Sequence, residues 1–152
     1  MSWSIRIERG DISVSPASFA TVTGGPKLVQ DLRCWILEHM GNDDMHPALG
    51  SVIDGGTTPD GTEIAGVIGT DDWREASAFV EAEIRRICRE YQKLQLARAK
   101  QDKLTLGRAT LIPSEILREV SDIQFSQVGD NLNVYVQIAT GTNQTFDLEL
   151  NF

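Results

Sequence analysis

The segment Asp72–Leu94, with the sequence DWREASAFVEAEIRRICREYQKL, decides what kind of fold the chain forms. Asp72 and Glu75 have the spacing of a helix N-terminus in which the Asp accepts free backbone N–H groups and the Glu reaches back. After them, apolar residues recur every three or four positions and so share one face of a helix. They are Trp73, Ala76, Val80, Ile84, Ile87, Tyr91 and Leu94.

The predicted helix continues to about Asp102, which gives it a length of roughly 45 Å at about 1.5 Å per residue. That is longer than the core of a small domain requires, so one end is in a position to project towards a neighbouring protein. We favour the simpler interpretation, in which the helix crosses its own sheet.

A shorter amphipathic helix is predicted upstream, because apolar residues again recur at helical spacing. They are Leu28, Leu32, Trp35, Ile36 and Met40, with Gly41 following as a left-handed C-cap. Residues 1–26 are predicted to form an extended N-terminal arm, in which Trp3, Ile5 and Ile7 alternate. Residues 42–69 are rich in Gly and Pro and are predicted to form a loop, with a short helix around Glu63–Ile68.

The chain after Gly107 is predicted to contain a short helix at Ser114–Val120 and then three antiparallel strands. Apolar residues alternate with polar ones, which places one side of each strand in the core. In the last two strands these apolar residues are Val134, Val136, Ile138, Phe146, Leu148 and Leu150. The sequence therefore predicts a single α+β domain over residues 1–152. Its helical part, 27–107, packs on a C-terminal sheet of about three strands at 121–152.

The last strand is predicted to leave an open edge, since its alternation continues to Phe152. Such an edge is a template for a strand of another chain. Residues 109–152 contain one basic residue, Arg118, against six Asp and Glu, so this part should attract a basic partner surface. The net charge of −8 for the whole chain disfavours nucleic acid as a partner.

The sequence also indicates the cellular compartment in which the chain is made. Residues 1–30 contain no uninterrupted apolar run, so neither a secretory signal nor a membrane span is predicted. The two cysteines, Cys34 and Cys88, fit buried thiols in a reducing compartment, and we expect synthesis in a cytoplasm.

No motif in the sequence predicts an enzyme. Neither Gly-x-Ser-x-Gly nor a recognised Cys signature occurs, and residues 24–27, GGPK, lack the spacing of a phosphate-binding loop. With 22 acidic residues, a carboxylate pair suited to glycoside hydrolysis is expected somewhere by chance alone. His39 and His46 lie near Asp43 and Asp44, but the spacing matches no zinc signature. We therefore predict no catalytic residue, no metal and no cofactor.

The segment Val22–Leu32, VTGGPKLVQDL, is followed by WILEHMG at 35–41 and HPALGS at 46–51. This ordered set resembles the baseplate wedge family of contractile phages, also called the sheath initiator, which has a relative in type VI secretion. The family pattern is a glycine turn, a Gln-Asp helix, a glycine and then Pro-x-x-Gly-Ser, before a long helix and a C-terminal antiparallel sheet. In this chain the motif loop contains Gly41, Pro47 and Gly50.

One part of the family pattern is missing. The family carries a Glu-Pro-Arg signature near the end of its long helix, where it helps to hold the wedge core together. The corresponding residues 89–93 read REYQK and contain no proline. By position, Arg89, Glu90 and Lys93 are the candidates for contacts with other wedge proteins.

The resemblance implies a non-enzymatic structural protein of the virion, located in the tail baseplate and made in the host bacterial cytoplasm. The implied partners are the tail sheath protein and other baseplate wedge, hub or tube proteins, with six copies in a six-fold assembly and neither nucleic acid nor membrane. The C-terminal strands would pair with arms of the first sheath ring, and the six apolar residues from Val134 to Leu150 would shape the joining sheet. We expect a chain truncated at Ser126 or at Asn143 to stay folded but to lose sheath nucleation.

Two alternatives stay open. Members of the family have been labelled as lysozyme-like, so the first is a cell-wall hydrolase of the tail. The second is an adaptor subunit of a type VI secretion system or of another injection apparatus.

Overall fold

The computed structural model describes residues 4–8, 11–12, 14–15, 18–19, 21–44, 46–68, 72–129 and 131–152. Its longest element is helix α2, Trp73–Leu106. The Asp72 carboxylate accepts the backbone N–H groups of Arg74 at 3.0 Å and Glu75 at 3.3 Å, and Gly107 ends the helix at a φ of +70°. The predicted long helix and its Asp cap are therefore confirmed.

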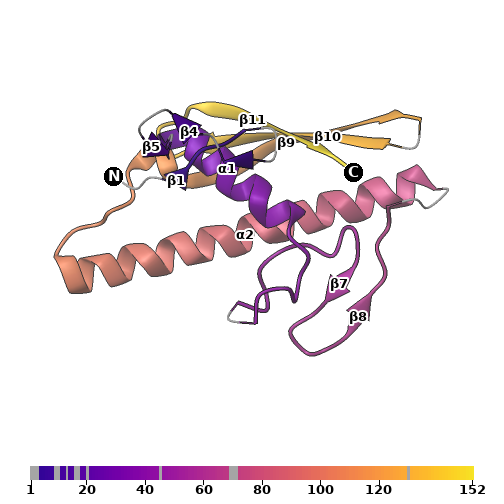
Figure 1. Cartoon of the computed structure of the whole chain (residues 1–152), viewed down its shortest axis with the longest axis horizontal. Helices are drawn as coiled ribbons and strands as arrows, with labels where there is room; N and C mark the ends of the chain where they lie inside the picture. The colour runs from indigo at the N-terminus through magenta and orange to yellow at the C-terminus, as the bar shows by residue number, and fades with distance from the viewer. Residues whose placement is uncertain are drawn as a thin grey trace.

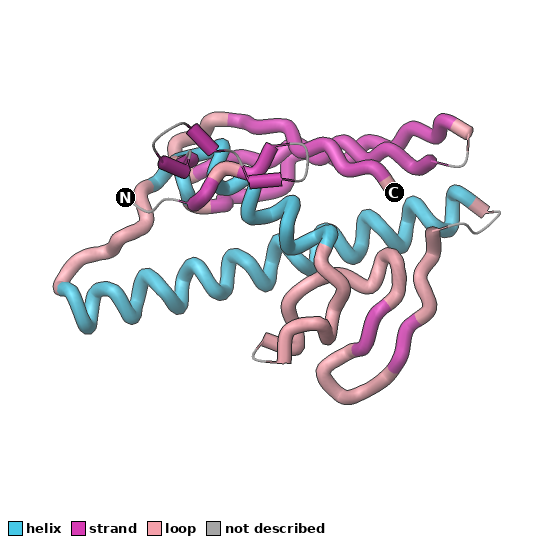
Figure 2. The backbone as a smooth tube through the Cα atoms, in the orientation of Figure 1, coloured by secondary structure: helices cyan, strands magenta, loops and turns pink. Residues whose placement is uncertain are grey.

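Three antiparallel strands form the C-terminal sheet, in the order β11-β10-β9 (Figure 1). They are β9 at Leu117–Val128, β10 at Asn131–Thr140 and β11 at Thr145–Asn151. Helix α2 packs against β9, and the shorter helix α1, Gly24–Leu37, packs against β11. The sheet lies on one side of α2, whereas the small hairpin of β7 (Gly56–Thr57) and β8 (Glu63–Ile64) lies on the other (Figure 2). The predicted α+β domain is confirmed.

The core forms where the inner face of the sheet meets both helices. Its aliphatic side chains come from every layer, and each one that is fully buried contributes about 1.5–3 kcal/mol relative to exposure. They include Leu28, Leu32 and Ile36 from α1, Val80, Ile84 and Ile87 from α2, and Val134, Val136, Ile138, Leu148 and Leu150 from the sheet.

Helix α2 is longer than this core. The middle of its predicted apolar face is buried, but Trp73 and Leu94 at the two ends are 46% and 50% exposed. After Gln95 no residue of α2 is buried, and the last turns run past the sheet towards the turn at Gly107 (Figure 1). Our interpretation that the helix only crosses its own sheet is therefore wrong for its C-terminal third, which projects.

Polar side chains tie α1 to α2 beside the apolar core. The Tyr91 hydroxyl donates to the Asp31 carboxylate at 3.0 Å, and Lys27 pairs with the same carboxylate. Trp35 packs edge-on against the Tyr91 ring, with 5.2 Å between the ring centroids. Burial and the neighbouring Asp31 charge both raise the pKa of Tyr91, so its hydroxyl keeps its proton.

Helix α1 ends earlier than the sequence predicted. It stops at Leu37, and Glu38 is already extended, with φ −74° and ψ 137°. The chain leaves the helix because residues 38–40 form backbone hydrogen bonds with Ser51 instead, which accepts from Met40 and donates to Glu38. Gly41 does have a left-handed φ of +87°, but it lies in the following turn and is not the C-cap.

The N-terminal segment is not a simple extended arm where the structure describes it. It doubles back into pairs of two-residue strands, and α1 begins at Gly24, inside the range predicted for the arm. The pairs are β1 (Ser4–Ile5) with β6 (Thr21–Val22), β2 (Ile7–Glu8) with β3 (Asp11–Ile12), and β4 (Val14–Ser15) with β5 (Ser18–Phe19). The Gln30 amide holds this segment on α1, since it accepts from Ile7 N at 2.9 Å and donates to Ile5 O at 2.8 Å. Trp3 lies outside the described residues.

Both short helices predicted in the loops are wrong. At Glu63–Ile64 the chain forms strand β8, which pairs with β7, Gly56–Thr57, because the Thr58–Thr62 turn folds it back. At Ser114–Val120 a single 3₁₀ turn, η1 at Pro113–Glu115, is followed directly by β9.

The start of β9 is held by the side-chain amide of Gln95. Its nitrogen donates to Glu115 O at 2.6 Å, and its oxygen accepts from Leu117 N at 2.9 Å. Gln95 is only 8% exposed, so water cannot replace either bond without local opening.

We predict that Gln95→Leu lowers the free energy of unfolding by about 3 kcal/mol, because it leaves a buried carbonyl and a buried N–H without partners. Urea denaturation of the purified chain measures this. The matched control is Gln101→Leu at an exposed position of the same helix, which should change stability by less than about 0.5 kcal/mol. Equal stability of the two variants would contradict the assigned role of Gln95.

Candidate functional site

The most distinctive surface feature is the edge of β11. Leu132 and Phe152 exchange both backbone hydrogen bonds, at 2.9 and 3.0 Å. In an antiparallel ladder, hydrogen-bonded pairs alternate with pairs that are not hydrogen-bonded. The backbone N–H and C=O groups of Leu150, and of every second residue before it, therefore point towards β10. The N–H and C=O groups that point away from the sheet belong to Thr145, Asp147, Glu149 and Asn151. No side chain among the described residues bonds to these outward groups.

The opposite edge of the sheet is partly closed. The Gln92 amide donates to the carbonyls of Leu117 at 3.3 Å and Arg118 at 2.7 Å, and Gln95 binds Leu117 as described above. Helix α2 therefore occupies the beginning of the β9 edge. Of the two edges, β11 presents its outward backbone groups along its whole length.

The surface beside the open edge is acidic. The residues whose backbone faces the edge also direct their side chains to the outer face of the sheet, so Asp147 and Glu149 are exposed. The register places Gln137 between Asp147 and Asp122 of β9, and Tyr135 beside Glu149. A strand that adds to this edge meets two carboxylates, which favours basic side chains on that strand.

The residues predicted to bind sheath lie on the other face. Val134, Val136, Ile138, Leu148 and Leu150 are all 1% exposed or less, and Phe146 packs against the core. Their side chains lie in the core, so they can shape the sheet only from its inner face and do not themselves reach a partner. They hold β10 and β11 in register, and the outward-facing alternate positions of β11 form the edge itself. The same alternation that located the core residues is the signal that finds these positions.

The predicted wedge-contact residues Arg89, Glu90 and Lys93 lie on α2 outside the core. Lys93 Nζ and Glu90 Oε1 are 2.7 Å apart, and this bond lowers the pKa of the Glu90 carboxyl. Arg89 is exposed. None of these side chains bonds to another described element.

The charged pair that does join elements is Glu83 and Arg86. Glu83 is 7% exposed and accepts from Val52 N at 3.1 Å, while Arg86 donates to both its carboxylate oxygens at 2.7 and 2.8 Å. Arg86 also donates to Gly50 O at 2.8 Å. The sequence reasoning missed this pair, although Glu83 falls on the apolar face of α2 between Val80 and Ile87.

The motif loop is built around this pair. Gly50 has a φ of +96°, and a Cβ there would lie 2.6 Å from Glu38 O. The Ser51 hydroxyl donates to Ile36 O at 2.7 Å and so satisfies a carbonyl of the last turn of α1. Gly41 approaches Thr57 O in the same way, at 2.8 Å for an added Cβ, whereas Pro47 is exposed. The Gly-Ser part of the motif is therefore a structural junction between α1 and α2.

The histidines form two separate pairs. His46 Nδ1 lies 2.9 Å from Asp43 Oδ2, and His39 Nε2 lies 3.8 Å from Asp54 Oδ2. Across the described part of the chain, no group of three His, Cys, Asp or Glu comes together as a metal site would require. In the same residues, no helix has the length and apolar character needed to cross a membrane.

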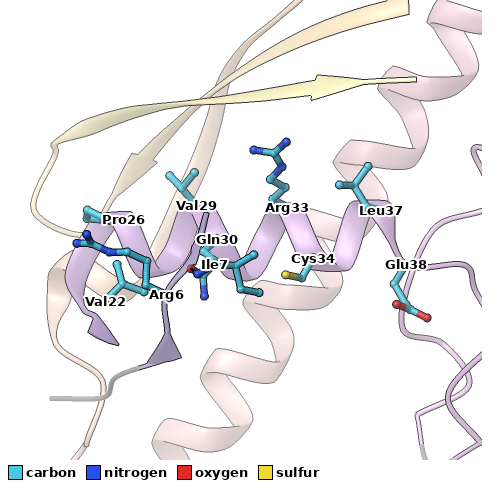
Figure 3. Close-up of a pocket in the computed structure, with 10 residues that line it drawn as sticks. All are labelled: Arg6, Ile7, Val22, Pro26, Val29, Gln30, Arg33, Cys34, Leu37 and Glu38. Carbon is cyan, nitrogen blue, oxygen red and sulfur yellow. Dashed lines mark hydrogen bonds between the residues drawn. The ribbon is translucent and has the colours of Figure 1, made fainter. Parts of the chain in front are cut away.

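A groove of about 660 Å³ runs along α1 beside the N-terminal strands (Figure 3). Its lining is largely apolar, with Ile7, Val29 and Leu37 among its residues. Of the described residues that line it, only Cys34 has a thiol or hydroxyl group. Partial burial and the nearby Asp31 charge raise the pKa of the Cys34 thiol. This environment is opposite to the one that activates a nucleophilic cysteine.

Comparison with protein-family models, with curated proteins and with solved structures finds no match to this chain. The geometry of the β11 edge and the resemblance over residues 22–51 therefore carry the functional inference.

We predict that neither thiol behaves as a catalytic nucleophile. Burial raises the pKa of Cys88 to about 11, so only about one molecule in a thousand carries its thiolate at pH 8. In a labelling time course with a thiol reagent, exposed Cys34 should react alone in the native protein, faster as pH rises, and Cys88 only after unfolding. Cys34→Ser should abolish native labelling. Rapid labelling of Cys88 in the folded variant would contradict the prediction.

Proposed function

We propose that this chain is a structural baseplate subunit of a contractile tail, which initiates sheath assembly by pairing β11 with a strand of the first sheath ring. The observation that carries the proposal is the open edge of β11, with the outward backbone groups of four alternate residues along it. The resemblance of residues 22–51 to the baseplate wedge family supplies the identity of the guest strand.

Strand addition suits this edge for two physical reasons. Main-chain hydrogen bonds give affinity without requiring a particular guest sequence, and the buried inner face keeps the template from shifting register. Leu148 and Leu150 are anchored in the core, so β11 is ordered before a guest arrives. Little conformational entropy is then lost on the side of this subunit.

The acidic side chains select the guest. Asp147 and Glu149 alternate along the edge and discourage pairing between two copies of β11, because like charges would then lie close together. A sheath arm with Lys or Arg at alternate positions meets the opposite charge. In the assembly that the resemblance implies, six copies offer six such edges to one sheath ring and adjoin other wedge, hub or tube proteins.

The groove along α1 gives little support to the alternative of a cell-wall hydrolase. Glycoside hydrolysis uses two carboxyl groups on either side of the scissile bond. Among the described residues that line this groove, Glu38 is the one carboxylate. This observation supports a structural role over a hydrolytic one.

Truncation is not a clean test of the proposal. We expected a chain cut at Asn143 to stay folded, but removal of β11 would strip Leu148 and Leu150 from the core. At about 1.5–3 kcal/mol for each side chain, this loss is comparable to the whole stability of a small domain. A point substitution on the outward side of β11 avoids the problem.

We predict that Glu149→Pro abolishes sheath nucleation while the subunit stays folded. The N–H of residue 149 points to the open edge, so proline removes no bond to β10 but blocks the approach of a guest strand. Polymerisation of the sheath protein of the same particle, seeded by the full-length chain, should fall by about tenfold or more.

The matched control is Glu149→Thr, which keeps the N–H, favours a strand and removes only the charge. It should retain most of the seeding activity. Circular dichroism and urea denaturation check that both variants are folded. Normal seeding by a folded Glu149→Pro chain would overturn the proposal, as would digestion of purified cell wall by the wild-type chain.

A further inference from the structure

The projecting end of α2 carries a second exposed surface of different chemistry. Residues at steps of four and three lie on one side of the helix, away from the sheet, and Leu104 continues the row one turn after Lys100. This basic face consists of Arg89, Lys93, Leu96, Lys100, Lys103 and Leu104, all exposed. It extends over about 22 Å of helix at about 1.5 Å per residue.

The composition of the basic face indicates a protein partner. Leu104 is 87% exposed and Leu96 is 58% exposed, on the same side of the helix as the basic residues. Two acidic residues lie in the same part of α2, one paired with a lysine of the basic face and the other bonded away from it. Glu90 pairs with Lys93, and Asp102 accepts from Thr110 N at 3.2 Å on the side towards the sheet. The face is therefore cationic in a chain whose net charge is −8.

The described residues also contain a surface that complements it. The outer face of the sheet, which we call the acidic face, consists of Asp122, Tyr135, Asp147 and Glu149. Tyr135 is 43% exposed in the centre of the sheet and offers an apolar ring to a leucine. Like the basic face, it is exposed.

We infer that the basic face of α2 binds the acidic face of a second copy of this chain. Lysines of the helix meet the carboxylates of the sheet, and the exposed leucines cover Tyr135. Pairing of two basic faces, or of two acidic faces, would bring like charges together and is disfavoured. The contact is head-to-tail, so each copy keeps one free face of each kind, and repetition produces a ring or a filament.

This contact shares the Asp147 and Glu149 side chains with the proposed strand addition, but it uses no backbone group of the β11 edge. A guest strand, in contrast, binds through the backbone at that edge. The contact also requires no sheath protein, so its failure in a sample that contains only this chain leaves the proposed function untouched.

Two charge-reversed variants test the inference, K100E/K103E on the basic face and D122K/D147K on the acidic face. Analytical ultracentrifugation of full-length chains at 150 mM salt is suitable, because a Debye length of about 8 Å screens the net charges but not the contact pairs. The wild type should self-associate with increasing concentration, and each variant alone should associate at least about tenfold more weakly. An equimolar mixture of the two variants should recover association, since the unaltered acidic face of one then meets the unaltered basic face of the other, and the reversed faces also complement each other.

The control R33E/R74E changes the net charge as much as K100E/K103E does, at exposed positions outside the basic face. It should associate like the wild type. A monomeric wild type at all concentrations would overturn the inference and assign the basic face to a different protein. Failure of the mixture to recover association, with both variants folded by circular dichroism, would overturn it as well.

Discussion

The burial of one face of the sheet against two helices is the constraint on which the rest of the molecule depends. Helix α2 supports β9 and helix α1 supports β11, while the side chains of β10 fill the space between them. Val134 and Ile138 are completely buried there, so β10 cannot move without opening the core. Because β10 is fixed, the strands on either side of it are fixed too, and β11 becomes a rigid edge.

Polar bonds between distant parts of the chain place the loops around this core. The Glu83 side chain is hydrogen-bonded to Val52, which lies 31 residues away in the sequence. The Tyr91 hydroxyl is hydrogen-bonded to Asp31, which lies 60 residues away. Gln95 likewise fixes the point where β9 begins. Since all three side chains lie on α2, the long helix orders the first half of the chain and the sheet together. Buried polar groups of this kind add little net stability when satisfied but are costly when broken, so they favour one arrangement over others.

Much of the architecture could be predicted from residue periodicity. The helical spacing after Asp72 and the strict alternation around Val136 both report which side of an element is buried, and burial decides the fold class.

The predicted ends of helices and strands were wrong where backbone groups form hydrogen bonds with residues far along the chain. Met40 bonds to Ser51 instead of continuing a helix. Leu117 bonds to the Gln95 side chain, and a strand begins there instead of a helix. No local pattern contains that information. The residues predicted for the sheath-binding strands lie on the buried face of the sheet, because apolar alternation marks the core more clearly than it marks the edge. The Glu83–Arg86 pair was not predicted. A carboxylate on an apolar helical face looks like a break in the apolar pattern as long as its partner is unknown.

In most binding surfaces the hydrogen-bonding groups and the charges depend on the same side chains. The geometry of β11 separates these two properties. In β11, the residues whose backbone faces outward are the same residues whose side chains leave the core. Thr145, Asp147, Glu149 and Asn151 can therefore be replaced without disturbing Leu148 or Leu150. The hydrogen-bonding template stays constant while the pattern of charges along it is free to change. A lineage of such subunits would be able to switch guest strands by surface substitutions alone, and a matching change in the guest would restore recognition at no cost in folding.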